Sequence, residues 1–203
     1  WADGAEYTGE WKNGVRHGRG VYRRAEGDTY DGQWRNDRMH GLGTLRRPDG
    51  SRYEGQWLNG RRHGRGNSFF PDGRKYDGEW KNDRIDGTGS MTWPNGETYS
   101  GSWKDDLMHG RGAFGFADGS VYEGAWAYGR MNGTGEYRYA RGMKYTGRFR
   151  DSRRDGKGVM IWPDGSRYEG EWVDDRMDGG GTLSRRDGSL YTGRWKPDRM
   201  NGS

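Results

Sequence analysis

The four histidines are the residues of this chain best suited to binding a metal, and they recur at one spacing. His17, His40 and His63 are 23 residues apart, and His109 stands two further periods along the chain. If each period adds one β-hairpin, equivalent side chains lie about 9.6 Å apart. Two ligands of one zinc ion, each about 2.1 Å from the metal, are only about 3–4 Å apart. The histidines therefore predict no metal site, and we expect them to form hydrogen bonds in a loop at one edge of a sheet.

Carboxylates are the other candidates for catalysis, and their placement argues against it. The pairs Asp105-Asp106 and Asp174-Asp175 fall in the same predicted loops as the histidines. General acids and bases need enclosed surroundings that shift their pKa values, which exposed loops do not supply. The sequence also lacks a phosphate-binding Gly-rich loop, a nucleophile elbow and any cysteine. We therefore predict a protein that is not an enzyme and needs no cofactor.

Composition limits the compartment and the class of partner. The absence of cysteine excludes a disulfide framework and fits a reducing compartment, so we expect a cytoplasmic protein. No apolar run approaches the ~20 residues of a membrane-spanning helix. The Gly-Arg-Gly triplets at 18–20, 64–66 and 110–112 are similar to parts of RNA-binding tracts. They coincide with repeated glycines, and the net charge of +5 is modest, so we predict no nucleic-acid binding.

The elements that must position these side chains follow from a 23-residue repeat. Tyrosine recurs at that spacing without insertion or deletion, and Gly stands two residues after each of these tyrosines. Trp stands four residues after all but one of them, where Phe149 replaces it. Such a period is typical of repeat arrays. We expect residues 1–203 to form a single array whose repeats start near 7, 30, 53, 76, 99, 122, 145, 168 and 191.

The repeated residues predict the core and the fold class. Aromatic and polar residues alternate from Glu6 to Lys12, which predicts a strand with one aromatic and one polar face. A polar connection over Asn13–Gly18, a short second strand over Arg19–Arg23 and a tight turn over Ala25–Asp28 complete one repeat. Connections this short join antiparallel neighbours. The predicted fold is all-β, a single-layer, elongated and twisted antiparallel sheet of serial β-hairpins.

The repeated Tyr, Gly and Trp are predicted to be structural. Aliphatic residues are too few for an ordinary core, so we expect stacked aromatic rings to form it. Gly two residues after Tyr leaves a gap that a ring from the adjoining strand can fill. Examples of this structural set are Tyr7, Gly9, Trp11, Tyr53, Gly55 and Trp57.

Residues 7–20 (YTGEWKNGVRHGRG) and 53–66 (YEGQWLNGRRHGRG) resemble the MORN repeat. The resemblance covers essentially the whole chain. It implies serial hairpins in one elongated sheet and no enzymatic activity in the repeats. Since MORN arrays occur in cytoskeletal and ciliary scaffolds such as radial spoke heads, in membrane-junction proteins and beside lipid kinases, the resemblance also implies a protein of the cytoskeleton, the cilium or the cytoplasmic face of a membrane.

Two sets of variable residues are candidate binding surfaces. The first lies two residues past the apolar position of the second strand, where the five middle repeats carry Phe70, Trp93, Phe116, Tyr139 and Trp162. If strand alternation continues that far, these rings add an aromatic row to a central trough, which either marks a partner site or only thickens the aromatic stack.

The second set lies in the basic segment 138–157, which carries eight cations against Asp151 and Asp155. Such a cluster is suited to a phosphoinositide or an acidic partner, at about 1 kcal/mol per cation near an anionic membrane. The alternative is a solvated surface, because alternation sends these residues to both faces. The candidate anion-binding residues are Arg148, Arg150, Arg153, Arg154 and Lys157.

These observations lead to two functional hypotheses. The first is a non-enzymatic scaffold whose aromatic trough binds a helix or extended peptide of a protein partner, or another array in a homodimer. The second is a phosphoinositide-binding module centred on the basic segment. The sequences at Trp1–Gly4 and Met200–Ser203 cut through a repeat, so we expect a fragment of a longer array, with end-to-end assembly by edge pairing.

Overall fold

A computed structural model describes residues 4–201, and in that range it contains β-strands and no helix. The described part therefore holds no helix long and apolar enough to cross a membrane. The predicted repeat ends at Trp1–Asp3 and Gly202–Ser203 lie outside the described residues.

The chain divides into two compact units, Trp1–Asp106 and Leu107–Ser203, each of which is described by itself. The strands of the first unit are β1 (Glu6–Lys12), β2 (Val15–Arg23), β3 (Thr29–Arg35), β4 (Arg38–Arg46), β5 (Arg52–Leu58), β6 (Arg61–Phe69), β7 (Lys75–Lys81), β8 (Arg84–Thr92) and β9 (Thr98–Lys104). Those of the second are β10 (Leu107–Gly115), β11 (Val121–Ala127), β12 (Arg130–Arg138), β13 (Lys144–Arg150), β14 (Arg153–Ile161), β15 (Arg167–Val173), β16 (Arg176–Ser184), β17 (Leu190–Lys196) and β18 (Arg199–Asn201).

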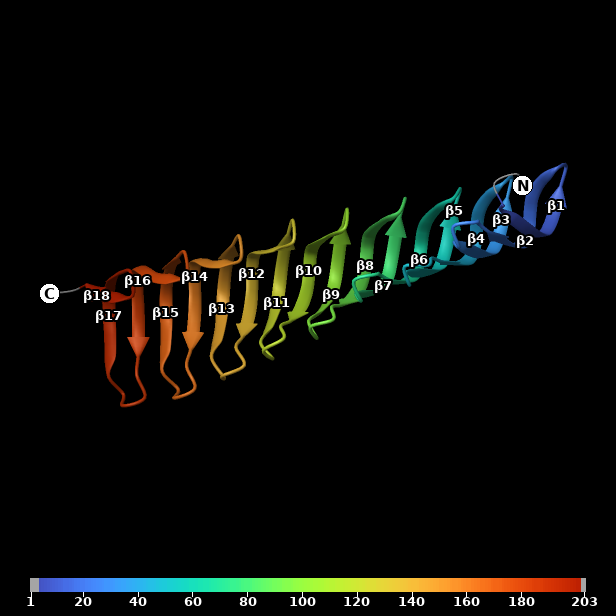
Figure 1. The fold of residues 1–203 in the computed structure, drawn as a ribbon. Helices are drawn as coiled ribbons and strands as arrows, with labels where there is room; N and C mark the ends of the chain where they lie inside the picture. The colour runs from blue at the N-terminus through green and yellow to red at the C-terminus, as the bar shows by residue number, and fades with distance from the viewer. Residues whose placement is uncertain (1–3, 202–203) are drawn as a thin grey trace. The chain divides into compact units, whose positions relative to one another are not determined.

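Within each unit, strands that follow one another in the chain lie side by side and pair antiparallel (Figure 1). Each repeat supplies one hairpin, and the first strand of the next repeat pairs with the second strand of the one before. The sheet stays open. The predicted fold class, all-β with serial antiparallel hairpins, is confirmed.

The turn inside each hairpin is shorter than the sequence predicted. β2 starts at Val15 instead of Arg19, so the connection consists of Asn13 and Gly14 alone. Both residues are left-handed, with φ of 51° and 77°, as a two-residue type I′ turn requires. Gly18, expected to end the loop, lies inside β2 with φ of 61°, next to a β-bulge that the sequence pattern did not reveal.

The connection between repeats is the predicted tight turn. The Arg24 N–H donates to the Asp28 carbonyl at 2.8 Å, and the Gly27 N–H donates to the Arg24 carbonyl at 3.0 Å. Because strand direction alternates, the two-residue turns and these longer turns lie at opposite edges of each sheet.

The buried tyrosines lie over pairs of glycines. A Cβ added to Gly32 would lie 2.5 Å from the Tyr30 hydroxyl oxygen, and one added to Gly43, its partner across β3 and β4, would lie 2.2 Å from it. The Tyr30 hydroxyl donates to the Gln33 carbonyl at 3.0 Å. Glycine is thus a packing device, as predicted, but the ring that fills the gap belongs to the same strand and not to the adjoining one, because the hydroxyl binds the strand's own backbone.

Tryptophan joins each repeat to the one before. Tyr30 makes edge-to-face contacts with Trp34 of its own repeat, at 5.1 Å between ring centroids, and with Trp57 of the next repeat, at 5.4 Å. The Trp57 indole N–H donates to the Gly43 carbonyl at 3.1 Å. At Phe149 the ring contacts persist, but the phenyl ring has no N–H to donate. The interface between repeats therefore combines ring packing, at about 0.5–1.5 kcal/mol per pair beyond area, with a backbone hydrogen bond.

Glycines under tyrosine rings should tolerate no side chain. In Gly158→Ala the new Cβ would lie 2.2 Å from the Tyr145 hydroxyl oxygen, whereas in Gly180→Ala it would meet nothing within 4 Å. Overpacking costs about 1–3 kcal/mol or more, so we expect a loss of that size for Gly158→Ala and little change for the control. Urea unfolding measures both, and equal stabilities of the two variants would contradict this account of the core.

The buried phenols should destabilise the protein at high pH. Burial raises the pKa of Tyr122 and of Tyr168 to about 12. The unfolded chain has an ordinary tyrosine pKa near ~10, so the folded state holds these protons more tightly. The resulting stability is fully present below about pH 10 and is lost as pH rises to about 12. Melting temperatures should fall across this window as phenolate absorbance appears, and a constant melting temperature there would contradict the prediction.

Candidate interaction surface

The two faces of each sheet differ in chemistry. The side that carries the repeated Tyr and Trp, here called the aromatic face, holds most of the buried side chains. The opposite side, here called the polar face, carries exposed residues such as Asp31 and Arg35. Across residues 4–201 no three His, Asp or Glu side chains gather closely enough to hold a metal.

The repeated residues of the structural set occupy the aromatic face. Tyr53 and Trp57 are buried, and Gly55 lies opposite Gly66 under the Tyr53 ring. Tyr7 and Trp11 occur in the first strand of the first repeat, where Trp11 is 51% exposed. The same repeated position is therefore exposed at Trp11 and buried at Trp57.

The five candidate aromatic residues lie in turns, just beyond the strands to which they were assigned. β6 ends at Phe69, and the Phe70 N–H donates to the Arg74 carbonyl at 2.9 Å while the Phe70 carbonyl accepts from Gly73. Trp93, Phe116, Tyr139 and Trp162 each make the same two hydrogen bonds. The strand therefore ends one residue before each of these aromatic residues, because their backbone N–H and C=O groups form hydrogen bonds within the turn. All five side chains are half-buried.

In the second compact unit, two of these rings extend the packing of the aromatic face. The centroid of Phe116 lies 4.6 Å from that of Phe114 and 5.3 Å from that of Tyr137. Tyr139 lies 4.3 Å from Tyr137. The result is a connected cluster of four rings, of which Phe114 is buried and the other three are half-buried. Partly exposed rings in contact form an apolar surface that a partner can cover.

The basic candidates divide between the two faces. Strand positions place Arg148, Arg150, Arg153 and Lys157 on the polar face, and Arg154 on the aromatic face, where it lies over Trp172.

Three of these five side chains form ion pairs within the chain. Arg150 binds Asp155 at 2.6 Å, and Arg153 binds Asp174 at 3.4 Å. Arg154 binds Asp175 at 3.0 Å. Since part of the segment's charge is neutralised locally, the structure does not bring the five cations together into one site.

An arginine arrangement on the aromatic face was not predicted from the sequence. The Arg62 guanidinium lies over Trp80 at 4.1 Å, its Nε contacts Asp83 Oδ1 at 3.3 Å, and an Nη–H donates to the Asp83 carbonyl at 2.8 Å. Arg16 and Arg154 repeat this geometry with the Trp and Asp that stand 18 and 21 residues later.

A signal for this arrangement is present in the sequence. The position equivalent to Arg62 holds Arg only in repeats where the turn residue 21 positions later is Asp. The reverse does not hold, because Asp106 and Asp198 face Ile85 and Met177. Where the partner is Gly60, Gly129 or Ser152, the position holds Met. Asp37, which accepts hydrogen bonds from the Arg16 backbone and guanidinium, has a pKa below its usual range for that reason.

The histidines occur in strands and not in loops. His17, His40, His63 and His109 lie in β2, β4, β6 and β10, each just before a Gly with φ of 59° to 64°. The Nδ1 atoms of His17, His40 and His63 are buried without a hydrogen-bond partner in the described part of the chain. The expected loop hydrogen bonds are therefore not made at these atoms. The bulge that places the histidines in strands could not be predicted from residue types alone.

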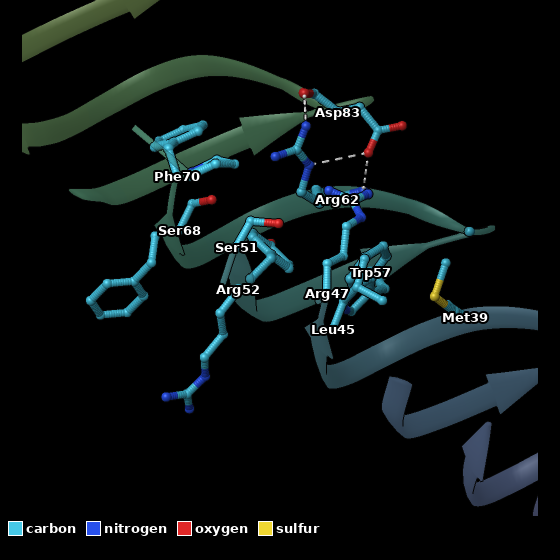
Figure 2. A pocket seen from close by; sticks show the side chains of 14 residues that line it. Met39, Leu45, Arg47, Ser51, Arg52, Trp57, Arg62, Ser68, Phe70 and Asp83 are labelled. Carbon is cyan, nitrogen blue, oxygen red and sulfur yellow. Dashed lines mark hydrogen bonds and ion pairs between the residues drawn. The ribbon is translucent and has the colours of Figure 1, made fainter. Parts of the chain in front are cut away.

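A hollow of about 360 Å³ opens on the aromatic face around Ser68. We call it the Ser68 hollow. It is lined by Met39, Leu45, Arg47, Ser51, Arg52, Tyr53, Trp57, Gly60, Arg62, Ser68, Phe69, Phe70, Pro71 and Asp83. Figure 2 shows Ser51, Ser68, Phe70 and Arg62 on one side of the strands, while the Arg52 guanidinium points away from Arg62. Sequence reasoning missed this site, although Ser at this position of the second strand departs from the apolar residues of the other repeats.

The chain matches the model of a known repeat family. The profile described as "MORN repeat" matches residues 7–29, 30–52, 53–73, 76–98, 99–121, 122–144, 145–167 and 168–190. The search of curated proteins found no match.

Solved structures give distant similarities. The chain is 15% identical to the SAS-4 (dCPAP) TCP domain of Drosophila melanogaster, described in complex with a proline-rich motif of Ana2 (dSTIL), with a TM-score of 0.47 over 77% of this chain and 85% of that one. It is 14% identical to the CPAP G-box domain, with a TM-score of 0.48 over 88% of this chain and all of that one.

The arginine on the aromatic face should contribute little to folding. Met occupies the same position in other repeats, and partly exposed ion pairs and cation–π contacts each contribute about 1 kcal/mol or less. We expect Arg62→Met to lower the free energy of unfolding by less than about 1 kcal/mol, and Arg62→Glu, which sets a carboxylate against Asp83, to lower it more. Urea unfolding measures the free energy of unfolding of each variant. A loss above about 2 kcal/mol for Arg62→Met would show that this arginine is structural.

Proposed function

We propose that this chain, which belongs to the MORN repeat family of structural and interaction repeats, is a non-enzymatic scaffold that binds a protein partner on its aromatic face. The partner contributes a helix or an extended peptide. The scaffold acts in the cytoplasm, associated with the cytoskeleton or a cilium. Its core residues recur in every repeat, so recognition falls to the residues that vary.

The observation that carries this proposal is the connected ring cluster of Phe114, Phe116, Tyr137 and Tyr139. Three of its four rings are half-buried, although the repeats that carry them have a buried core of their own in Tyr99, Trp103, Tyr122 and Trp126. Burial raises the pKa of Tyr137 and of Tyr139. Aromatic residues with an apolar body and a polar tip are enriched at the centres of protein interfaces.

A homodimer is a second form of the same proposal. The aromatic face of another copy, or an unpaired strand edge, supplies the partner. Phosphoinositide binding by the segment 138–157 is the alternative function. Arg148 and Lys157 on the polar face are its strongest members, because Arg150, Arg153 and Arg154 are held by aspartates.

Site-specific photo-crosslinking in cells tests which face binds. A photoreactive phenylalanine in place of Tyr139, on the aromatic face, should capture a protein partner, because this half-buried ring belongs to the cluster that the partner is proposed to cover. The same group in place of Glu169, an exposed residue of the polar face, is the matched control and should capture none. Products are identified by mass, so a second copy of the chain is recognised as a homodimer.

Capture from Glu169 alone, or from neither position, would contradict the proposed face. Charge-dependent pelleting with phosphoinositide liposomes, abolished by Arg148→Glu with Lys157→Glu, would support the alternative function. Fractionation with axonemes or cytoskeletal polymer tests the proposed location, and failure of the crosslinked complex to cofractionate with either would contradict it.

A further inference from the structure

Five hairpins bind a side-chain oxygen at their bulge. In each of them a Glu or Gln of the first strand, on the polar face, accepts a hydrogen bond from the backbone N–H of the residue nine positions later. The acceptors are Glu10, Gln33, Gln56, Glu79 and Glu171, at distances of 2.6 to 3.3 Å. The first strand is irregular at this point, so a side-chain oxygen takes the place of a ladder hydrogen bond.

The sixth repeat does not supply this oxygen. Ala125 stands at the position of the acceptors, and Thr134 stands nine residues later. The register still shifts between Gly124 and Trp126, so the bulge itself is present. A Cβ added to Gly133, which has φ of 95°, would lie 3.1 Å from the Ala125 Cβ. Because alanine ends at Cβ, it carries no atom that can accept from the Thr134 N–H, and within residues 4–201 no other side chain does so.

The fourth repeat shows what the bulge of the sixth can bind. Thr88, the equivalent of Thr134, donates to Glu79 Oε2 from its N–H at 2.6 Å and from its hydroxyl at 3.1 Å. These two donors hold the pKa of the Glu79 carboxyl below its usual range, so they favour the ionised carboxylate. Thr134 carries the same two donors and is exposed. It is therefore suited to a carboxylate that comes from outside the chain.

Two arginines flank Ala125 and Thr134. Arg111 pairs with Ala125 across β10 and β11, and Arg148 pairs with Thr134 across β12 and β13. The Arg148 stem leans over Gly156, and both arginine side chains are exposed. Neither guanidinium forms an ion pair in the described part of the chain. Their positive charge favours an anionic ligand over a neutral or basic one.

An apolar edge lies beside this position. The next repeat has an ion pair at its turn edge, between Arg130 and Asp151 at 3.4 Å. The equivalent positions here are Leu107 and Tyr128, which are 45% and 78% exposed. Tyr128 is also left-handed, with φ of 52°, at a turn position where most repeats have Asn or Asp. A bulky residue with this backbone is strained, which points to a role outside folding.

We propose that the sixth repeat binds an acidic segment of a partner protein, whose carboxylate takes the place that a Glu or Gln side chain fills in other repeats. The carboxylate accepts from the Thr134 N–H and hydroxyl and pairs with Arg111. A neighbouring apolar side chain of the same segment covers Tyr128 and Leu107. This apolar edge favours a protein segment over a free anion.

This contact goes beyond the proposed function, because it lies on the polar face. Thr134 in β12 is three strands from Glu169 in β15, which is about 14 Å at the usual strand spacing. A segment confined to the sixth repeat therefore lies away from a photoreactive group at Glu169.

The test supplies the missing oxygen from within the full chain. Ala125→Gln introduces the side chain of Gln33, which binds the equivalent N–H at 2.8 Å. It should raise the melting temperature and shift the Thr134 amide resonance, which shows that the variant folds and that the donor is occupied. Ala127→Gln is the matched control, because it makes the same change on the same strand, past the bulge.

The probes are three capped pentapeptides that begin and end in serine, with a glutamate between two leucines, a lysine between two leucines, or a glutamate between two serines. The glutamate–leucine peptide should move the Thr134 amide resonance of the wild type. It should bind the wild type and Ala127→Gln about tenfold or more tightly than Ala125→Gln, since the variant loses a hydrogen bond to a charged group. The lysine peptide should not bind.

Two further variants separate the charge from the apolar contact. Arg111→Gln should weaken both glutamate peptides, and salt should weaken their binding to the wild type. Tyr128→Asn restores the residue of equivalent turns and should weaken the glutamate–leucine peptide alone. Titrations followed by amide chemical shifts measure each affinity.

Equal affinity of the wild type and Ala125→Gln for the glutamate–leucine peptide overturns the site, as does equal binding of the glutamate and lysine peptides. Phosphoinositide vesicles that move the Thr134 resonance when the peptide does not would assign the site to phosphate and overturn the acidic segment. Photo-crosslinking through Tyr139 reports on the aromatic face separately. A partner captured there would leave the proposed function standing while this site fails.

Discussion

Each repeat depends on one tyrosine ring lying flat over two glycines of a hairpin. In the third repeat, the Tyr53 ring covers Gly55 and Gly66, and its hydroxyl donates to the Gln56 carbonyl at 2.9 Å. A Cβ at either glycine would overlap the ring, so both positions are closed to every other residue. The same ring then offers its edges and faces to Trp57 and Trp80. The sequence is periodic because of this contact, since the ring, the two glycines and the two tryptophans must all recur at the same spacing in each repeat.

This arrangement leaves the chain free to vary elsewhere. With the core supplied by aromatic rings, the second-strand position opposite each tyrosine accepts Leu, Met, Phe, Tyr or, at Ser68, a small polar residue. The position of Arg62 accepts Arg, Met or Ile, and the first turn residue accepts Phe, Trp, Tyr or Arg. These three variable positions lie on or beside one face in each compact unit. Differences between repeats therefore become differences in the shape and charge of a surface, without loss of the fold.

Local features of the fold could be predicted in part. The alternation around Tyr7 predicted the first strand, and Pro48-Asp49-Gly50 and its equivalents indicated the turns between repeats. The second strand was predicted too short because Gly18 reads as a loop residue, whereas its left-handed backbone belongs to a bulge. The same bulge explains why His17 lies in a strand. Backbone hydrogen bonding, which residue types do not specify, determines both the length of the second strand and the position of His17. The side chains of Arg148 and Arg154 were grouped by proximity in sequence, but strand alternation separates them.

The sequence by itself determined the period, the hairpin unit and the identity of the core residues, since these depend on short-range spacing that recurs in every repeat. Only the tertiary structure decided what surrounds each variable residue. The ring cluster at Phe116, the pairing of Arg62 with Asp83 and the hollow at Ser68 each join residues from neighbouring repeats. Their contacts depend on strand register and on the position of a bulge. A change of one residue in register would move each side chain to the opposite face.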